Sequence, residues 1–420
     1  MSLDQLTAAS HDRPPRRDPR RERRSPQDAG PAGRWRFWGT AYTLLILLTG
    51  TNLPTPLYRG YQAGFGFSPL IVTLIFATYV AVLIPSLLLA GPLSDLLGRR
   101  TVLLSAVALA ALGALLFALA TSTGWLFAAR ALQGVALGVA SGPLTATLTE
   151  LEPNGDRRRA ALVSTVATVG GLGLGPVLAG LLAQYAPAPH VLPFAVEIAL
   201  LVPAAVTMAA LPVMASGIRR GPHLPEIPAA VRSIFVTSGT ASFLAFSVMG
   251  LSLALVPTYV AILSGSGNLF LAGAAVALML LCSALAQLLG YGRQARDLEL
   301  AGLPLLATGL VLLALAGGLS SLPLLLLAAA TGGTGQGLTF LGGITAVNQA
   351  APAEHRADVL STFYVIIYLG VGVPVIGVGF LATVSGLLFA VQCFAAAVAV
   401  ACVVMLIVLA LRRHRSPTAG

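Results

Sequence analysis

Two ionisable residues lie inside long apolar stretches of this sequence, where a charged group is most costly. Arg130 falls within residues 125–147 and Glu197 within residues 190–214. Each lies five to seven residues after the start of its stretch. An ionisable side chain at the centre of a membrane helix costs roughly 2.5–3.5 kcal/mol on insertion scales. The two residues therefore either form a buried pair that lowers both costs, or serve a site in which Glu197, the one carboxylate in these stretches, carries a proton.

Neutral polar side chains inside the apolar stretches form a second group of candidates, proposed to line a cavity: Asn52, Gln133, Ser242, Ser247, Gln336, Thr339, Tyr364 and Tyr368. Each alone is a candidate for a helix–helix hydrogen bond worth under ~1 kcal/mol. Together they indicate a cavity with few charges, flanked by aromatic and aliphatic side chains. Such a cavity suits an amphipathic or lipophilic solute better than a multiply charged sugar phosphate or dicarboxylate.

The first apolar stretch carries two prolines, Pro54 and Pro56, close to its end. Proline has no N–H group, so a helix breaks there and backbone carbonyls lose their donors. The freed carbonyls either bind an ion or a substrate, or the break only shapes the outer gate. Asn52, just before the prolines, cannot titrate.

The composition indicates which elements must position these residues. Hydrophobic residues make up 56% of the chain and charged residues 10%, with a mean hydropathy of +0.87, whereas a soluble domain has roughly 25% charged residues. The net charge of +10 resides in tails and short loops, and not on a basic face with interleaved aromatic side chains. We therefore predict an all-α integral membrane protein and no nucleic-acid partner.

Twelve apolar segments are long enough to cross a bilayer as helices, which takes about 20 residues. They cover residues 37–58, 69–90, 101–120, 125–147, 160–184, 190–214, 234–262, 268–290, 299–319, 322–347, 359–383 and 386–411. An even number of spans leaves both termini on one side of the membrane.

Arginines identify that side as the cytoplasm, because the cytoplasmic loops of membrane proteins are rich in basic residues. With both termini inside, the outer loops hold only Arg59, and the inner short loops hold Arg99, Arg100, Arg157, Arg158, Arg159, Arg219, Arg220, Arg232, Arg293, Arg296 and Arg356. We expect a multi-pass protein of the cell membrane, with both termini cytoplasmic.

The longest interior polar connection, residues 215–233, divides the chain into two six-span halves. We expect an arginine-rich disordered tail over 1–35, six-helix bundles over 36–214 and 234–411, and a cytoplasmic tail over 412–420.

The halves form an internal repeat, with a short deletion between its two parts. Gln133-Gly134 and Gln336-Gly337 occupy similar places, and Glu150, Pro153, Arg157, Ser164, Thr165, Gly173 and Gly175 correspond to Gln349, Pro352, Arg356, Ser361, Thr362, Gly370 and Gly372. Two pseudo-symmetric halves of parallel orientation, with a site between them, are the architecture of a rocking transporter.

Residues 91–100 separate the second and third spans, and we expect a tight cytoplasmic loop with a degenerate counterpart near residues 290–297. Asp95 is placed to meet the start of span eleven near Ser361 and Thr362, where a helix N-terminus favours an anion and the contact would hold the inner face shut. The candidate gate residues are Gly91, Asp95, Gly98, Arg99, Arg100, Glu150 and Arg157. Alternatively, the loop only fixes topology through its two arginines.

Several of these motifs together resemble the major facilitator superfamily, over essentially all of residues 37–411. The pattern Gly91-x-Leu93-x-Asp95-x-x-Gly98-Arg99-Arg100 matches that family's signature between spans two and three. Two further matches are Arg130-x-x-Gln133-Gly134 in span four and Glu150 followed by Arg157 between spans four and five.

Span five resembles the glycine-proline signature of the proton-coupled antiporter branch, chiefly drug exporters, through Gly171, Gly175, Pro176 and Gly180. Glycines along one face let two helices approach closely, and the proline bends the span. The resemblance implies that Arg130 lies on a cavity-lining span and senses substrate or influences a proton site. Many such exporters carry an acid in the first span, which this chain lacks, so proton coupling would move to Glu197 or Asp95.

We therefore expect a secondary transporter that exports hydrophobic or amphipathic small molecules by alternating access, in exchange for protons. The alternative is a facilitator or proton symporter that imports a neutral metabolite. No histidines form a metal-ligand pair at helical spacing, and without lysine there is no phosphate-binding loop. We accordingly expect no metal, no cofactor and no enzymatic activity, and a monomer in the bilayer.

Overall fold

The computed structural model describes residues 31–212, 227–265, 267–352 and 354–414, and in those ranges all regular structure is helical. The elements are α1 (Pro31–Asn52), η3 (Thr55–Leu57), α2 (Tyr58–Phe65), α3 (Pro69–Leu97), α4 (Arg99–Ala118), α5 (Thr123–Leu151), α6 (Arg157–Tyr185), α7 (Leu192–Ala209), α8 (Ala229–Ala254), α9 (Val256–Ser264), α10 (Leu269–Gly290), α11 (Ala295–Gly318), α12 (Leu322–Ala350), α13 (Arg356–Ser385) and α14 (Leu387–His414).

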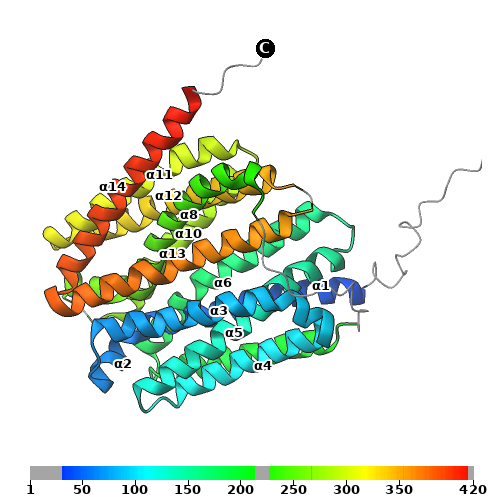
Figure 1. Ribbon diagram of the computed structural model, residues 1–420. Helices are drawn as coiled ribbons and strands as arrows, with labels where there is room; N and C mark the ends of the chain where they lie inside the picture. The colour runs from blue at the N-terminus through cyan, green and yellow to red at the C-terminus, as the bar shows by residue number, and fades with distance from the viewer. Residues whose placement is uncertain (1–30, 213–226, 266, 353, 415–420) are drawn as a thin grey trace, which may run out of the picture.

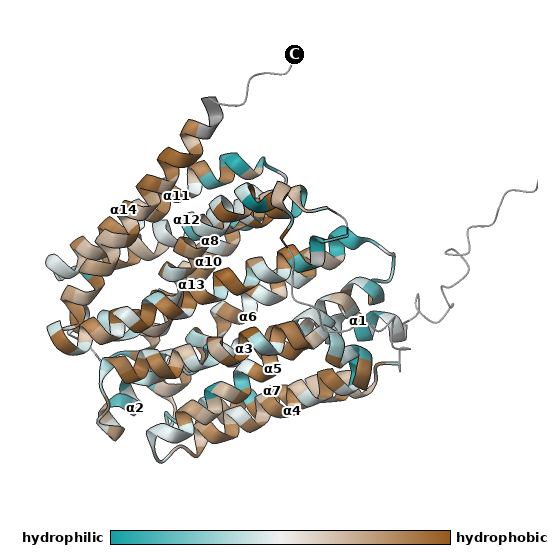
Figure 2. Cartoon of the chain, viewed as in Figure 1, coloured by the Kyte–Doolittle hydropathy of each residue, from teal (hydrophilic) through white to brown (hydrophobic). Residues whose placement is uncertain are grey.

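Eleven helices of the described residues are long and apolar enough to cross a membrane, and α1, with 22 residues, is a twelfth long helix. Hydrophobic residues run along the helices, and hydrophilic residues gather at their ends, notably at the end where α1 begins (Figure 2). The prediction of an all-α integral membrane fold is confirmed.

Spans one and seven are each broken near the same end, as the repeat would require. Span one consists of α1, the short η3 and α2, and span seven consists of α8 and α9. Pro54 and Pro56 lie in the first break, and Pro257 follows the second. The break that the prolines predicted for span one is therefore present.

The connection expected over residues 91–100 is much shorter in the structure, because α3 remains helical through Pro92 and ends only at Leu97. Membrane helices tolerate internal glycine and proline, since neighbouring groups satisfy the backbone that they free. Gly98 alone makes the turn, with a φ of 82° that favours glycine. The prediction of a ten-residue loop was wrong.

The boundaries of the two halves also shift. Residues 31–35, predicted as part of a disordered tail, begin α1, and residues 229–233, predicted as linker, begin α8. The rest of that tail, residues 1–30, and residues 213–226 of the linker region lie outside the described residues, as do 415–420 of the C-terminal tail.

Helices α1–α7 form one bundle and α8–α14 the other, and they meet where α6 packs on α10 and α3 packs on α13 (Figure 1). Among the described residues, two hydrogen bonds join the bundles: Leu70 N–H donates to Thr383 Oγ1 at 3.1 Å, and Leu269 N–H donates to Gln184 Oε1 at 2.8 Å. Gln184 and Thr383 lie near the C-terminal ends of α6 and α13, opposite the arginines that begin those helices. These bonds therefore join the bundles at the end away from the arginine-rich connections.

Candidate functional site

A central cavity of about 330 Å³ lies between the two bundles. Its lining, drawn from both bundles, is aliphatic, aromatic or neutral polar and includes no Asp, Glu, Arg or His: Leu48, Thr51, Asn52, Phe76, Tyr79, Leu137, Ser164, Thr165, Thr168, Val169, Leu172, Phe246, Met249, Leu253, Leu280, Ser283, Gln287, Gln336, Phe340, Tyr364, Ile367, Tyr368 and Val371. On α6 the polar lining residues belong to the half of the helix that follows Arg157. The cavity thus extends toward the arginine-rich end of the molecule.

Four of the predicted cavity residues line this space: Asn52, Gln336, Tyr364 and Tyr368. Asn52 also ties α1 to α6, because its Nδ2 donates to the Leu172 carbonyl at 3.2 Å. Gln336 accepts a hydrogen bond from Ser283 across α10 and α12, and Gln287 donates to Ser283 at 3.2 Å.

The other four predicted cavity residues lie elsewhere. Ser247 donates to the Phe243 carbonyl at 2.8 Å within α8, and Thr339 of α12 is fully buried against Gly302 of α11. Ser242 is fully buried in α8, where it contacts Gly343 of α12, and Gln133 is buried beside α1. Tyr79 and Phe76 line the cavity but escaped the sequence analysis, although their spacing of three residues puts both on one face of a helix. Their identification requires knowing which face of α3 is directed toward the central cavity.

Arg130 is fully buried and does not line the cavity. Its Nε donates to the hydroxyl of Tyr58, and its Nη1 donates to the Thr51 carbonyl at 2.5 Å and to Gln133 Oε1 at 3.0 Å. Four aromatic rings, those of Tyr58, Phe76, Tyr79 and Phe117, have their centroids 5.4–5.8 Å from the guanidinium carbon. Cation–π attraction and hydrogen bonds thus hold the charge in place.

The partners of Arg130 and Gln133 explain the spacing of the Arg-x-x-Gln motif. The Gly50 carbonyl lacks its usual helical donor because residue 54 is proline, and the Thr51 carbonyl faces the end of α1. Gln133 Nε2 donates to Gly50 O at 3.0 Å, and Arg130 Nη1 donates to Thr51 O. Side chains of α5 therefore donate to both carbonyls, and binding of an ion or substrate there stays a prediction that these bonds do not support.

Glu197 faces the same break from α7. Its side chain is buried against Gly50, where an added Cβ would overlap the carboxyl oxygen Oε1. The other oxygen, Oε2, and Arg130 Nη2 are both buried without a hydrogen-bond partner. Among described residues the ion pairs join Arg99 with Glu150 and Arg159 with Glu152, so the predicted Arg130–Glu197 pair is absent.

A void of about 10 Å³ separates the Glu197 carboxyl from the central cavity. Its lining includes Thr51, Gln133, Leu137 and Glu197, and Thr51 and Leu137 also line the central cavity. A space of this size, with polar groups around it, is about the minimum that holds one water molecule.

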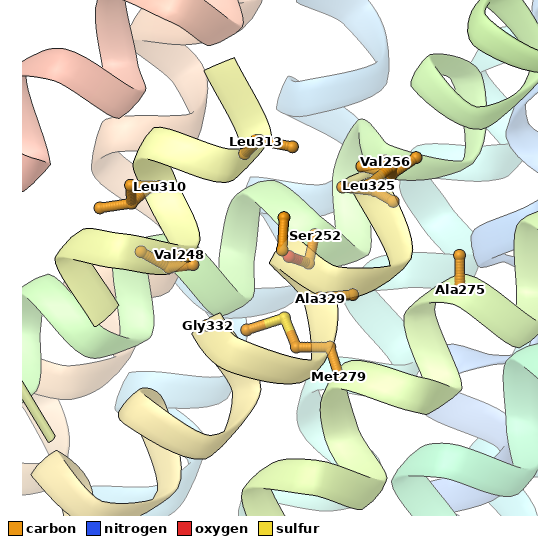
Figure 3. Close-up of a pocket in the computed structure, with 12 residues that line it drawn as sticks. Val248, Ser252, Val256, Ala275, Met279, Leu310, Leu313, Leu325, Ala329 and Gly332 are labelled. Atoms are coloured by element: carbon orange, nitrogen blue, oxygen red, sulfur yellow. The ribbon is translucent and has the colours of Figure 1, made fainter. Parts of the chain in front are cut away.

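The corresponding region of the second bundle is apolar. Because Gln133 corresponds to Gln336, the counterpart of Arg130 is Gly333, which packs on the Met279 backbone. Nearby, a cavity of about 20 Å³ has Ser252 as its one polar side chain among aliphatic residues and Met279 (Figure 3). The buried arginine and carboxylate of the first bundle thus have no equivalent at this place in the second.

The glycines of α6 lie at two close helix contacts. Added Cβ atoms at Gly171 and Gly175 would overlap the carbonyl oxygens of Leu45 and Thr49 in α1, and one at Gly180 would crowd the Leu269 carbonyl of α10. Helix α6 is therefore held between its own bundle and the other. The glycine spacing predicted close helix approach, and the structure shows it both within the first bundle, at α1, and at the junction of the halves, at α10.

The candidate gate residues cluster at the arginine-rich end. Arg99, at the start of α4, forms an ion pair with Glu150 near the end of α5. Arg157 is exposed as the first residue of α6, Gly91 and Arg100 are also exposed, and Asp95 is half-buried in the last turn of α3.

A third buried ionisable residue, Glu299, was missed. We placed residue 299 at the edge of a span, but α11 begins at Ala295, so Glu299 lies inside the helix and is 2% exposed. Asp297 in the first turn of α11 was the one available signal of an earlier helix start, since acidic residues favour that position.

Outside the spans, His190 in the α6–α7 connection lies against α2. Its ring centroid is 4.8 Å from that of Tyr61, and an added Cβ at Gly60 would overlap the imidazole. Partial burial lowers the pKa of His190 from its ordinary value. The neutral ring therefore packs against α2 at neutral pH.

A family model described as Major Facilitator Superfamily matches residues 40–296, more than half of the chain. Among curated proteins, "Putative multidrug resistance protein MdtD" of Cronobacter sakazakii is 34% identical over 157 residues, which cover 36% of this chain and 32% of that protein. The protein of the same name from Escherichia coli is 33% identical over 155 residues, with the same coverage. The aligned part of the chain thus spans about a third of the length of these relatives.

Solved transporter structures share the fold. The peptide transporter POT in complex with sulfate superposes with a TM-score of 0.76 at 15% identity, covering 91% of this chain and 95% of that one. For the nucleoside transporter NupG the TM-score is 0.68 at 14% identity, covering 89% and 98%. A bacterial homolog of the human lysosomal transporter Spinster, in its inward-facing unoccupied conformation, gives 0.67 at 14% identity, covering 91% and 96%. At these identities the likeness concerns the fold alone.

Proposed function

This chain belongs to the major facilitator superfamily of transporters, and from that premise we propose that it exports hydrophobic or amphipathic small molecules by alternating access, in exchange for protons. The observation that carries the proposal is the central cavity, which both bundles line without any Asp, Glu, Arg or His. Burying a charge without a partner is costly, so this lining favours solutes of low charge. The printed name of the curated relatives, a multidrug resistance protein, supports the same substrate class.

The contacts between the bundles support alternating access. Hydrogen bonds of Leu70 and Leu269 join the bundles at one end, and the cavity extends toward the other. The excess of arginine at that other end favours a cytoplasmic location for it, and for both termini. The conformation is then inward-facing and ready to load a solute from the cytoplasm or inner leaflet.

We place proton exchange at Glu197. One carboxyl oxygen is buried without a partner, and the adjoining void shares Thr51 and Leu137 with the central cavity. Water that enters between those two side chains would let the carboxyl exchange a proton with whichever side the cavity faces. Arg130 is close enough for its charge to act on Glu197 without direct contact.

We assign the gate role to the cytoplasmic end of the first bundle. In the outward-facing conformation Asp95 would approach the N-terminus of α13 and close the cavity from inside. That helix begins at Arg356, so Ser361 and Thr362, predicted at its start, lie more than one turn further along. The Arg99–Glu150 ion pair would hold the ends of α4 and α5 together while the bundle rocks.

The test is efflux from loaded cells of a host that lacks its own exporters, across a panel of lipophilic compounds. Export by the wild type should stop when the proton gradient is dissipated. Glu197→Gln should lose the dependence on the gradient, whereas Glu354→Gln, at an exposed carboxylate, should retain it.

Two results would count against parts of the proposal. Export that continues at an unchanged rate without a gradient would favour the facilitator alternative. Normal gradient dependence in Glu197→Gln would leave antiport in place and make Glu197 a packing residue.

A further inference from the structure

A second and larger cavity, of about 810 Å³, lies outside the central one, at the arginine-rich end of the second bundle. Helices α8, α11, α12 and α14 and the α10–α11 connection line it. Its polar lining residues include Ser238, Arg293, Arg296, Glu299 and Gln349. Neither the central cavity nor the Arg130–Glu197 region shares these residues, so the second cavity is a separate site.

Glu299 is the unusual feature of this cavity. Its side chain is 2% exposed, it takes part in neither of the ion pairs found among the described residues, and its Oε1 is buried without a hydrogen-bond partner. Ser238 hydrogen-bonds to the carboxyl group, but the oxygen Oε1 still has no donor. A buried acceptor of this kind calls for a donor, and a positively charged N–H donor fits a carboxylate best.

Two arginines supply the opposite charge beside it. Arg296 precedes Glu299 by three residues and so lies on the same face of α11. Its Nη2 donates to the Leu409 carbonyl at 2.6 Å, but its Nε has no partner. Arg293 is exposed at the rim. The cavity therefore offers donors for an anion and, one turn away, an acceptor for a cation.

We propose that this cavity binds the phosphoethanolamine head group of a membrane lipid, with the phosphate on Arg293 and Arg296 and the primary ammonium on Glu299. Guanidinium groups match phosphate oxygens, and the ammonium supplies the N–H that Glu299 Oε1 lacks. A quaternary ammonium has no N–H and cannot donate a hydrogen bond to Glu299 Oε1, so a choline head group fits this cavity less well.

The surroundings favour a lipid over a free zwitterion. The apolar side chains of Ile234 and Leu409 line the cavity beside the charged groups, and Ile234 is 40% exposed. The cavity also lies where α10 ends and α11 begins, at the level where a bilayer's head groups are expected. Basic pockets between membrane helices are known sites for lipid head groups.

The experiment compares the full chain in nanodiscs of phosphatidylethanolamine or phosphatidylcholine with matched acyl chains. For the wild type we expect a higher melting temperature in phosphatidylethanolamine, and preferential retention of that lipid in native mass spectrometry. Glu299→Gln should reduce the retention preference about tenfold, the effect of one hydrogen bond to a charged group. Asp297→Asn, at an exposed carboxylate on the same helix, should leave it unchanged.

A second pair of variants covers the case in which Glu299→Gln fails to fold. Arg293→Gln should lower the retention of both phospholipids, whereas Arg232→Gln, at an exposed arginine outside the cavity, should not. Equal stabilisation of the wild type by the two lipids would overturn the proposal. So would full stabilisation by free phosphoethanolamine in phosphatidylcholine discs, which would make the ligand a soluble zwitterion.

Discussion

At the scale of single residues, Arg130 and Gln133 have a structural duty that their motif does not reveal. Both come from one face of α5 and donate to carbonyls at the break that ends α1. A broken helix inside a membrane needs such donors, because no water is present to replace them. Arg130 therefore positions the break, and any effect that it has on transport passes through α1 or through its charge on Glu197.

Replacing Arg130 with Met keeps a flexible, unbranched apolar side chain but shortens it and removes every donor. The Thr51 carbonyl would then be buried without a partner, which costs about 1–3 kcal/mol, and the cation–π contacts would be lost as well. We expect a clear fall in the melting temperature of the purified protein. Arg59→Gln is the control, because Arg59 is exposed and follows Tyr58 directly. Equal melting temperatures for the two variants would contradict the assigned role.

Sequence analysis identified Arg130 and Glu197 because a charge inside an apolar run is visible without a structure. It could not establish their partners, which lie on other helices: Arg130 bonds to residues 51, 58 and 133, and not to Glu197. Glu299 was missed because the estimated span began at that residue, whereas α11 begins four residues earlier. Side-chain partners and helix starts both depend on packing that the periodicity of one chain does not encode.

At the scale of elements, α6 joins the two halves through small residues. Gly171 and Gly175 allow α1 to pack closely on α6, and Gly180 does the same for α10. The Pro176 carbonyl of α6 contacts Gly273 of α10. The repeat counterpart of α6, helix α13, packs in the same way between α8 and α3, where an added Cβ at Gly370 would crowd the Phe243 carbonyl. Small residues let helix backbones approach closely, so these two helices can pack on both bundles.

Gly175→Ala tests this packing against a matched control on the same helix. The added methyl group would overlap the Thr49 carbonyl of α1, whereas an added Cβ at Gly173 meets nothing within 4 Å. We expect Gly175→Ala to destabilise the protein by about 1–3 kcal/mol through overpacking. Gly173→Ala should have little effect. Thermal unfolding of both variants measures the difference, and equal stability would show that α1 and α6 separate without cost.

Helix positions were predicted more accurately than connections. The twelve apolar segments each correspond to a long helix or a broken pair, because hydropathy reports directly on burial in a bilayer. The connection at residues 91–100 was misjudged because Gly91 and Pro92 indicate a turn in a soluble protein, whereas a membrane helix accommodates both.

At the scale of the whole molecule, the two bundles share a fold but not a chemistry. The first has Arg130, Gln133 and Glu197 around the break of span one. The second has an apolar cavity of about 20 Å³ near the corresponding place, and its buried carboxylate, Glu299, lies at one end of the bundle. This asymmetry suits a division of roles in which the first bundle exchanges protons, while rocking of the two bundles moves the solute.

Under the proposed function, the rocking equilibrium should respond to the two hydrogen bonds that join the bundles away from the arginine-rich end, the end that the proposal places outside. A Gln184→Leu and Thr383→Val double variant removes both acceptors, each bond being worth about 0.5–1.5 kcal/mol. We expect the outward-facing population to rise about tenfold. Thr149→Val is the control, because its exposed hydroxyl bonds only to Thr145 within α5.

Spin labels at the exposed residues Arg158 and Glu354, which belong to different bundles at the arginine-rich end, measure this shift in a background without the three cysteines. The distance between the labels should shorten in the double variant, because opening the outer end closes the inner one when rigid bundles rock. An unchanged distance distribution would show that other contacts of α3 with α13 and of α6 with α10 set the conformation. A lengthened distance would contradict rigid rocking itself, since both ends would then open together.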